Sequence, residues 1–176
     1  MRKKSIFFLV AFLALTLIVA LLILKSTTSA PRFSVGENSE EHEILFPVAR
    51  VIDGDTIDVV IDGKTERIRF IGIDTPETVD DRKKIQCYGP EASARMKELL
   101  SAKSVALEMK PDEDRDDYGR LLRYVFFQGN DVGAMMLEEG YARSLCFAFP
   151  HPRCAEYEAL EAAAKSAERG RWEACR

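Results

Sequence analysis

The residues of this chain best suited to chemistry are three acids at the ends of predicted strands. Asp74 and Glu77 stand three positions apart directly after the apolar run 68–73, and Asp55 belongs to an earlier turn. Carboxylate oxygens are preferred ligands of hard cations, and neither histidine nor cysteine lies within ten residues of Asp55 or Asp74. Calcium tolerates irregular geometry, so we expect Asp55 and Asp74 to hold calcium rather than magnesium.

Two arginines complete a set suited to hydrolysing a phosphodiester. Arg69 interrupts an apolar run, where a charge needs a partner, and Arg120 stands at the start of another run. Arg69 either pairs with Asp55 or Asp74 or binds a phosphate through two parallel hydrogen bonds. With a cation bridging the phosphate and Glu77 as base, both arginines would stabilise the transition state. Taken singly, each residue is equally well a turn, a strand cap or a surface charge, and only the combination favours hydrolysis.

Alternating apolar residues predict the elements that position these side chains. Strands are expected at 44–52, 57–61, 67–73, 105–109 and 121–127. Helices are expected from Gly89, over 132–140 and over 155–169, with Gly170 as a C-cap. The dipeptide Asp62-Gly63 predicts a hairpin between the second and third strands. This order fits an α+β fold, a five-stranded Greek-key barrel of OB type with three helices, whose open face often binds oligonucleotides.

The N-terminal segment indicates that the folded domain is exported from the cytoplasm. Residues 6–24 carry no charge and are long enough to cross a bilayer as one helix, with Arg2, Lys3 and Lys4 on the inner side. Residues 1–25 are therefore expected to be a transmembrane anchor, residues 26–43 a polar linker and residues 44–176 the folded domain. A signal peptide cleaved near Ala30 is the alternative. The expected product is a single-pass membrane protein with its domain outside the cytoplasm, or a secreted protein if the segment is cleaved.

The charge balance excludes a general binder of polyanions. Lysine and arginine number 25, and four of them precede Pro31, before the first acidic residue. The part after residue 30 therefore has 21 basic against 29 acidic residues, a net charge of −8. Any binding of nucleic acid must then depend on a local arginine-lined cleft and a bridging cation.

Four cysteines all lie in the exported part of the chain. An even number in an oxidising compartment favours disulfides, although the sequence leaves all three pairings open. A zinc site is the alternative, but the cysteine spacing contains no CxxC motif. The four are Cys87, Cys146, Cys154 and Cys175.

Four segments in order resemble the staphylococcal nuclease, or thermonuclease, family. They are residues 51–56, 69–77, 88–94 and 116–120, within a resemblance that runs from about residue 48 to 172. The resemblance implies an OB-fold barrel with three helices. It also implies a calcium-dependent endonuclease that cleaves DNA and RNA and leaves 3′-phosphate ends.

Matched position by position, the resemblance also implies roles for single residues. Asp55, Asp74 and the main-chain oxygen of Thr75 would hold calcium, and Arg69, Glu77 and Arg120 would be catalytic. Tyr118 would lie near the phosphate of the nucleotide, and Lys83 and Lys84 would lie in a loop that flanks the substrate.

Two departures from the family pattern concern the substrate. Asp117 stands where the prototype of the family, staphylococcal nuclease, has a lysine. Where that nuclease has tyrosines that contact the base, this chain has Cys146, Phe147 and Phe149. Either phenylalanine could stack on a base, and we expect one of them to lie in the core.

Two other functions would suit the same fold. A nuclease-like barrel that binds nucleic acid or protein without cutting would lack some of the acids and arginines, which this chain retains. A calcium-stabilised adhesion domain would have no need of Arg69 and Arg120. The expected partners are DNA and RNA as substrates and a membrane for the anchor, and the protein is expected to be a monomer.

Overall fold

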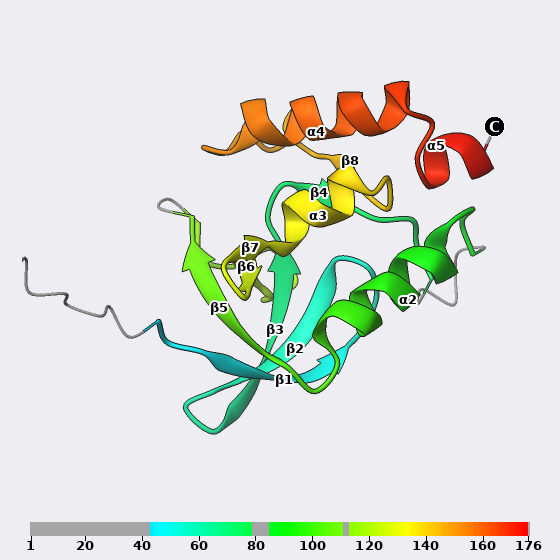
Figure 1. The fold of residues 1–176 in the computed structure, drawn as a ribbon. Coiled ribbons are helices and arrows are strands. Elements are labelled where there is room, and N and C mark those ends of the chain that lie inside the picture. Colours follow the sequence, from blue (N-terminus) through cyan, green and yellow to red (C-terminus); the bar gives the residue numbers. More distant parts are fainter. Residues whose placement is uncertain (1–42, 79–84, 111–112, 176) are drawn as a thin grey trace, which may run out of the picture. The chain divides into compact units, whose positions relative to one another are not determined.

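Five strands form a closed barrel in the computed structural model, which describes residues 43–78, 85–110 and 113–175 (Figure 1). The strands pair antiparallel in the order β3-β2-β1-β5-β6, and a parallel pairing of β3 with β6 closes the ring. This closed barrel with helices is the OB-type arrangement predicted from the sequence. The strands are β1 (Phe46–Val51), β2 (Thr56–Ile61), β3 (Lys64–Phe70), β5 (Ser104–Met109) and β6 (Leu121–Phe127).

The hairpin between β2 and β3 sets the register of the first half of the barrel. Asp62 and Gly63 adopt φ values of 49° and 76°, the left-handed conformation that a two-residue turn requires. Ile57, Val59 and Ile68 then point inward and are fully buried. The hairpin predicted from Asp62-Gly63 is therefore confirmed.

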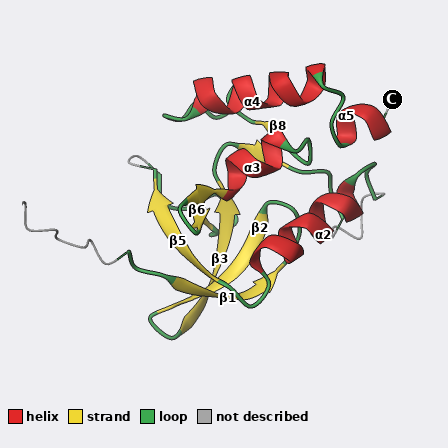
Figure 2. Cartoon of the chain, in the orientation of Figure 1, coloured by secondary structure: helices red, strands yellow, loops and turns green. Residues whose placement is uncertain are grey.

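The described residues also form four helices, of which α2 and α3 pack directly against barrel strands (Figure 2). Asp131 caps α3 by accepting a hydrogen bond of 3.1 Å from the backbone N of Ala134, and Pro90 occupies the first turn of α2. Helix α3 lies between the barrel and α4, whose Tyr157 is fully buried (Figure 1). The helices are α2 (Gly89–Leu100), α3 (Val132–Glu138), α4 (Cys154–Ser166) and α5 (Arg171–Ala174).

Two expectations about element ends are wrong. The third strand ends at Phe70 rather than at residue 73, because Gly72 turns the chain with a φ of 76°. Its last expected residue, Ile73, belongs instead to β4 (Ile73–Asp74), which pairs with β8 (Arg143–Ser144). Strand β7 (Asn130–Asp131) pairs with the end of β6. Gly170 is not the C-cap of α4, which ends at Ser166, but the N-cap of α5, a single turn that the sequence pattern did not predict.

The proposed anchor and almost all of the proposed linker lie outside the described residues. Within residues 43–78, 85–110 and 113–175, no helix has both the length and the apolar character needed to cross a membrane.

Both pairs of cysteines are joined as disulfides. Cys87 bonds to Cys175 and Cys146 bonds to Cys154, which confirms the preference for disulfides and selects one of the three pairings. The first disulfide connects residues that are 88 positions apart and ties the start of α2 to the C-terminal turn.

The turn at Gly72 generates a test of the packing around it. Gly72 and Gly63 have the same φ of 76°, but a Cβ atom at Gly72 would overlap the ring of His151, whereas a Cβ atom at Gly63 would meet nothing within 4 Å. Gly63→Ala is expected to lower the free energy of unfolding by about 1 kcal/mol through backbone strain alone. Gly72→Ala is expected to lower it by about 3 kcal/mol, because the ring must also move. Urea unfolding measures both, and equal losses would contradict the packing of His151 on Gly72.

Candidate active site

Asp55 joins the start of β2 to the segment that follows β4. Asp55 is 6% exposed, and its Oδ2 accepts hydrogen bonds from the backbone N of Thr75 at 2.8 Å and from Thr75 Oγ1 at 3.0 Å. Gly54 permits this approach, since a Cβ atom there would lie 2.8 Å from Thr75 Cγ2. Two of the three residues predicted to hold calcium, Asp55 and Thr75, are therefore in direct contact.

Arg69 lies between two predicted calcium ligands. Its Nη1 is 3.3 Å from Asp55 Oδ1, and its Nη2 is 3.5 Å from Asp74 Oδ1. The same guanidinium donates a hydrogen bond of 2.9 Å to the carbonyl oxygen of Ile73, and only 13% of the Arg69 side chain is exposed. The ion pair expected with one of the two acids thus forms with both, and it brings together Asp55, Arg69 and Asp74.

Arg69 and Arg120 line one surface pocket with a volume of about 250 Å³. The guanidinium of Arg120 lies 5.3 Å from the centre of the Tyr118 ring, and Tyr118, which is 85% exposed, lines the same pocket. Besides the two arginines, one lysine and three acidic side chains line the pocket. These further charged residues are Lys110, Glu113, Asp116 and Asp117.

Asp116 fixes the direction of Arg120, although the sequence suggested no role for it. Its Oδ2 accepts a hydrogen bond of 2.6 Å from Arg120 Nε, and its Oδ1 accepts one of 2.9 Å from the Arg120 backbone N. One carboxylate therefore holds both the side chain and the backbone of the arginine.

Glu77 lies on a segment whose backbone is held by Gln86. It follows Asp74 by three residues, and Gln86 holds its backbone through hydrogen bonds of 3.1 Å and 3.0 Å. Its Oε1 accepts a hydrogen bond of 3.0 Å from the backbone N of Thr78. Arg69 and Arg120 line the pocket, whereas Glu77 is not among the described residues that do so. Lys83 and Lys84 lie outside the described residues.

Arg143 is a site residue that the sequence analysis missed. Strand β8 places it opposite Asp74 on β4, and its Nε and Nη2 lie 2.9 Å and 2.8 Å from Asp74 Oδ2. The two residues are 69 positions apart, and β8 has only two residues. No pattern of apolar residues marks so short a strand, so the sequence contained no signal for this contact.

The donor atoms at this end of the barrel fit a hard cation. Asp55 and Asp74 offer carboxylate oxygens on either side of Arg69, and Asp53 adds a third carboxylate next to Asp55. Burial, together with the negative charge of Asp55, raises the pKa of Asp53 to about 6. Asp55 and Asp74, with the main-chain oxygen of Thr75, would hold a cation that takes oxygen ligands.

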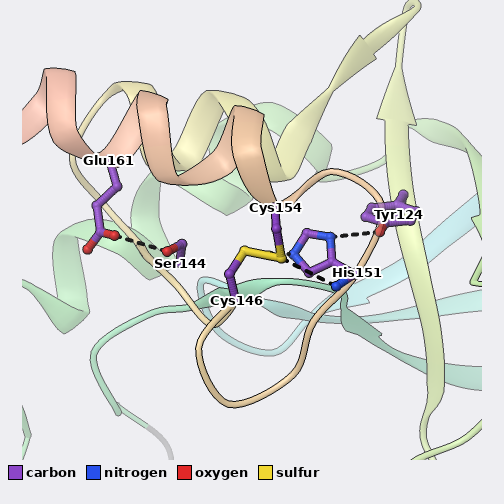
Figure 3. Close-up of a disulfide and its surroundings, with 6 residues drawn as sticks. All are labelled: Tyr124, Ser144, Cys146, His151, Cys154 and Glu161. Atoms are coloured by element: carbon purple, nitrogen blue, oxygen red, sulfur yellow. Dashed lines mark hydrogen bonds between the residues drawn. A yellow bond between two sulfur atoms is a disulfide. The ribbon is translucent and has the colours of Figure 1, made fainter.

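The loop after β8 is closed by the Cys146–Cys154 disulfide (Figure 3). Phe147 and Phe149 are 101% and 64% exposed, so the expectation that one of them lies in the core is wrong. Just before the two phenylalanines, the chain is held to the barrel by a hydrogen bond of 2.9 Å from the Leu145 backbone N to the Gly72 carbonyl oxygen. Phe149 lines the same pocket as the two arginines.

Comparison with known proteins gives consistent matches. Residues 67–174 match the family described as staphylococcal nuclease homologue. The chain is 40% identical over 159 residues to the thermonuclease of Staphylococcus hyicus, a match that covers 88% of this chain and 91% of that protein. It is 46% identical over 94 residues to endonuclease YncB of Bacillus subtilis, covering 53% of this chain but only 44% of YncB. Over 99 residues it is 44% identical to the thermonuclease of Staphylococcus intermedius, covering 56% of this chain and 58% of that protein.

Arg143 should weaken the attraction of Asp74 for a cation. In Arg143→Gln the positive charge beside the carboxylate is lost, and the Kd for calcium is expected to fall about fivefold, a modest change because Arg143 is half exposed. Calorimetric titration of the purified protein with calcium measures this Kd. Arg50→Gln is the matched control, since Arg50 is also exposed and pairs with an aspartate, Asp58, outside the site. A Kd that is unchanged or higher in Arg143→Gln would contradict this influence.

Proposed function

Because this chain belongs to the staphylococcal nuclease family and is a nuclease, we propose that it is a calcium-dependent endonuclease acting on DNA and RNA. The products would carry 3′-phosphate ends. The observation that supports the proposal most directly is the position of Arg69. This residue contacts both predicted calcium carboxylates and shares a pocket with Arg120.

The acids supply the means to bring a cation to the phosphate. Asp55, Asp74 and the main-chain oxygen of Thr75 would hold calcium, which when bound neutralises charge on a phosphate oxygen and orients water. Thr75 donates two hydrogen bonds to Asp55, so the distance between these two groups is constrained before any ligand binds.

The two arginines supply fixed positive charge on the phosphate. Arg69 is oriented by Asp55, Asp74 and two backbone carbonyls, and Arg120 is oriented by Asp116. Donors that are already oriented lose little free energy in reorganisation when negative charge develops on the phosphoryl oxygens. We assign to both arginines the stabilisation of the transition state.

Glu77 supplies the acceptor for a proton. A carboxylate three residues after Asp74 suits removal of a proton from the attacking water, or ordering of the water that attacks. The backbone hydrogen bonds with Gln86 fix the segment on which Glu77 lies.

We also propose that the nuclease acts outside the cytoplasm as a monomer. The uncharged segment 6–24 would anchor it in a membrane with the domain outside, or direct its secretion if the segment is cleaved. Two disulfides in the domain support this proposal, because they persist in oxidising compartments.

Digestion of nucleic acid is expected to require calcium. The purified protein incubated with plasmid DNA, single-stranded DNA or RNA in calcium should produce fragments with 3′-phosphate ends, and excess chelator should stop the reaction. Gel analysis, with phosphatase treatment of the ends, measures the outcome. Binding without digestion in calcium would favour a non-cutting barrel, and neither binding nor digestion would favour a calcium-stabilised adhesion domain.

Single substitutions test the catalytic roles. Arg69→Lys and Arg120→Lys keep the charge but lose the two-pronged contact, and kcat is expected to fall about a hundredfold in each. Glu77→Gln removes the proton acceptor and is expected to lower kcat by on the order of a hundredfold. Lysine is chosen at position 69 because alanine would leave the buried Asp55 carboxylate without its ion pair.

Arg67→Lys, two positions earlier on β3, is the matched control for these substitutions. Arg67 pairs with Asp58 and not with the acids of the site, so its kcat should match that of the wild type. Melting temperatures of all variants verify that the fold is retained. An unchanged kcat in any of the three site variants would remove that residue from the mechanism.

A further inference from the structure

One wall of the substrate pocket is built from a loop that a disulfide closes. We call residues 146–154 the disulfide loop, because Cys146 and Cys154 at its ends are bonded to each other. Two of its side chains, Phe149 and His151, line the pocket together with Arg69 and Arg120. Phe149 is 64% exposed, so an apolar ring stands in water beside two arginines that would bind a phosphate. A base attached to that phosphate could cover this ring.

His151 connects the disulfide loop to the barrel beneath it (Figure 3). Its Nδ1 lies 2.9 Å from the hydroxyl of Tyr124 on β6, and its Nε2 lies 3.3 Å from Cys146 Sγ. A disulfide sulfur has no hydrogen to donate, so Nε2 donates to the sulfur and Nδ1 accepts from Tyr124. Burial lowers the pKa of His151, which favours the neutral ring that this arrangement requires.

The Cys146–Cys154 bond connects the disulfide loop to helix α4, which is fixed by buried contacts. Cys154 is the first residue of α4, and the Cys154 Sγ also accepts a hydrogen bond of 3.3 Å from the His151 backbone N. Helix α4 is fixed by Tyr157, which is fully buried and donates its hydroxyl hydrogen to Asp131. At the other end, Leu145 is hydrogen-bonded to Gly72. Phe149 therefore lies on a short segment held at both ends and at His151.

We propose that the Cys146–Cys154 disulfide and His151 are positioning residues that hold Phe149 against the base of a bound nucleotide. The proposal rests on the nuclease function proposed above and adds to it a determinant of substrate affinity. A loop that is already ordered loses little conformational entropy when a ligand binds, so the disulfide should raise the affinity for the nucleotide. The reacting phosphate is contacted by other residues, so kcat should not depend on the disulfide loop.

Removal of each disulfide separates positioning from general stabilisation. Cys146→Ser/Cys154→Ser is expected to raise KM for a single-stranded oligonucleotide about tenfold, with kcat within about twofold of the wild type. Cys87→Ser/Cys175→Ser is the matched control, since no residue of the segments that this bond joins, 85–88 and 171–175, is among those that line the pocket. This control should lower the melting temperature and leave KM unchanged. Equal changes in KM in the two double variants would reduce the disulfide loop to a structural role and overturn the proposal.

Coupling between substitutions tests whether the disulfide acts through Phe149. Phe149→Ala is expected to raise KM about tenfold when the Cys146–Cys154 bond is intact, and less than about twofold when it is absent. Tyr124→Phe, which removes the hydrogen bond to His151, should raise KM about threefold with kcat unchanged. Additive effects of Phe149→Ala and the cysteine substitutions would contradict positioning.

Binding measured without cutting distinguishes this proposal from the proposed function. In the Glu77→Gln protein with calcium, fluorescence anisotropy reports the Kd for a fluorescein-labelled oligodeoxythymidylate, and loss of the Cys146–Cys154 bond should raise that Kd about tenfold. An unchanged Kd overturns the positioning role even if the wild type digests DNA. Failure of the wild type to digest DNA, with the Kd change still observed, overturns the nuclease mechanism and retains the role of the disulfide loop in binding.

Discussion

Arg69 carries its positive charge with only 13% of its side chain exposed, and the carboxylates of Asp55 and Asp74 compensate for the cost of that burial. Asp55 directly precedes β2, Arg69 lies on β3 and Asp74 lies on β4, so these ion pairs form only when the β2–β3 hairpin and the turn at Gly72 are in place. The same pairs hold two carboxylates at one end of the barrel, where they are available to a cation. The fold and the candidate active site therefore depend on one set of contacts.

Two features of the pocket would favour local binding of a nucleotide to a protein whose net charge is −4. The first is electrostatic: Arg69 and Arg120 face one pocket, and Asp116 and the acids around Arg69 fix their directions. The second is apolar, because Tyr118 and Phe149 expose aromatic rings at the same pocket. The arginines would attract a phosphate, and a base could cover the aromatic rings. Local binding of a nucleotide therefore needs no favourable overall charge.

The segments around the candidate active site are held to the barrel by different means. Backbone hydrogen bonds hold the turn at Asp116, a strand pair of two residues holds Arg143 opposite Asp74, and a disulfide with His151 holds Phe149. Each is a short-range constraint on a segment that has little apolar burial of its own. The barrel supplies the rigid frame to which these constraints attach, as Gly72 illustrates by allowing His151 to pack directly on the backbone.

The amino-acid sequence alone was sufficient for the features that depend on neighbours along the chain. Alternating apolar residues predicted the five barrel strands, Asp62-Gly63 predicted the hairpin, and the spacing of Asp55, Arg69 and Asp74 suggested a shared site. Contacts between distant segments were not predictable in this way. The pairing of the cysteines, the approach of Arg143 to Asp74 and the exposure of Phe147 and Phe149 all depend on how the barrel closes. Closure places residues up to 88 positions apart in contact, and no local pattern of side chains encodes such a distance.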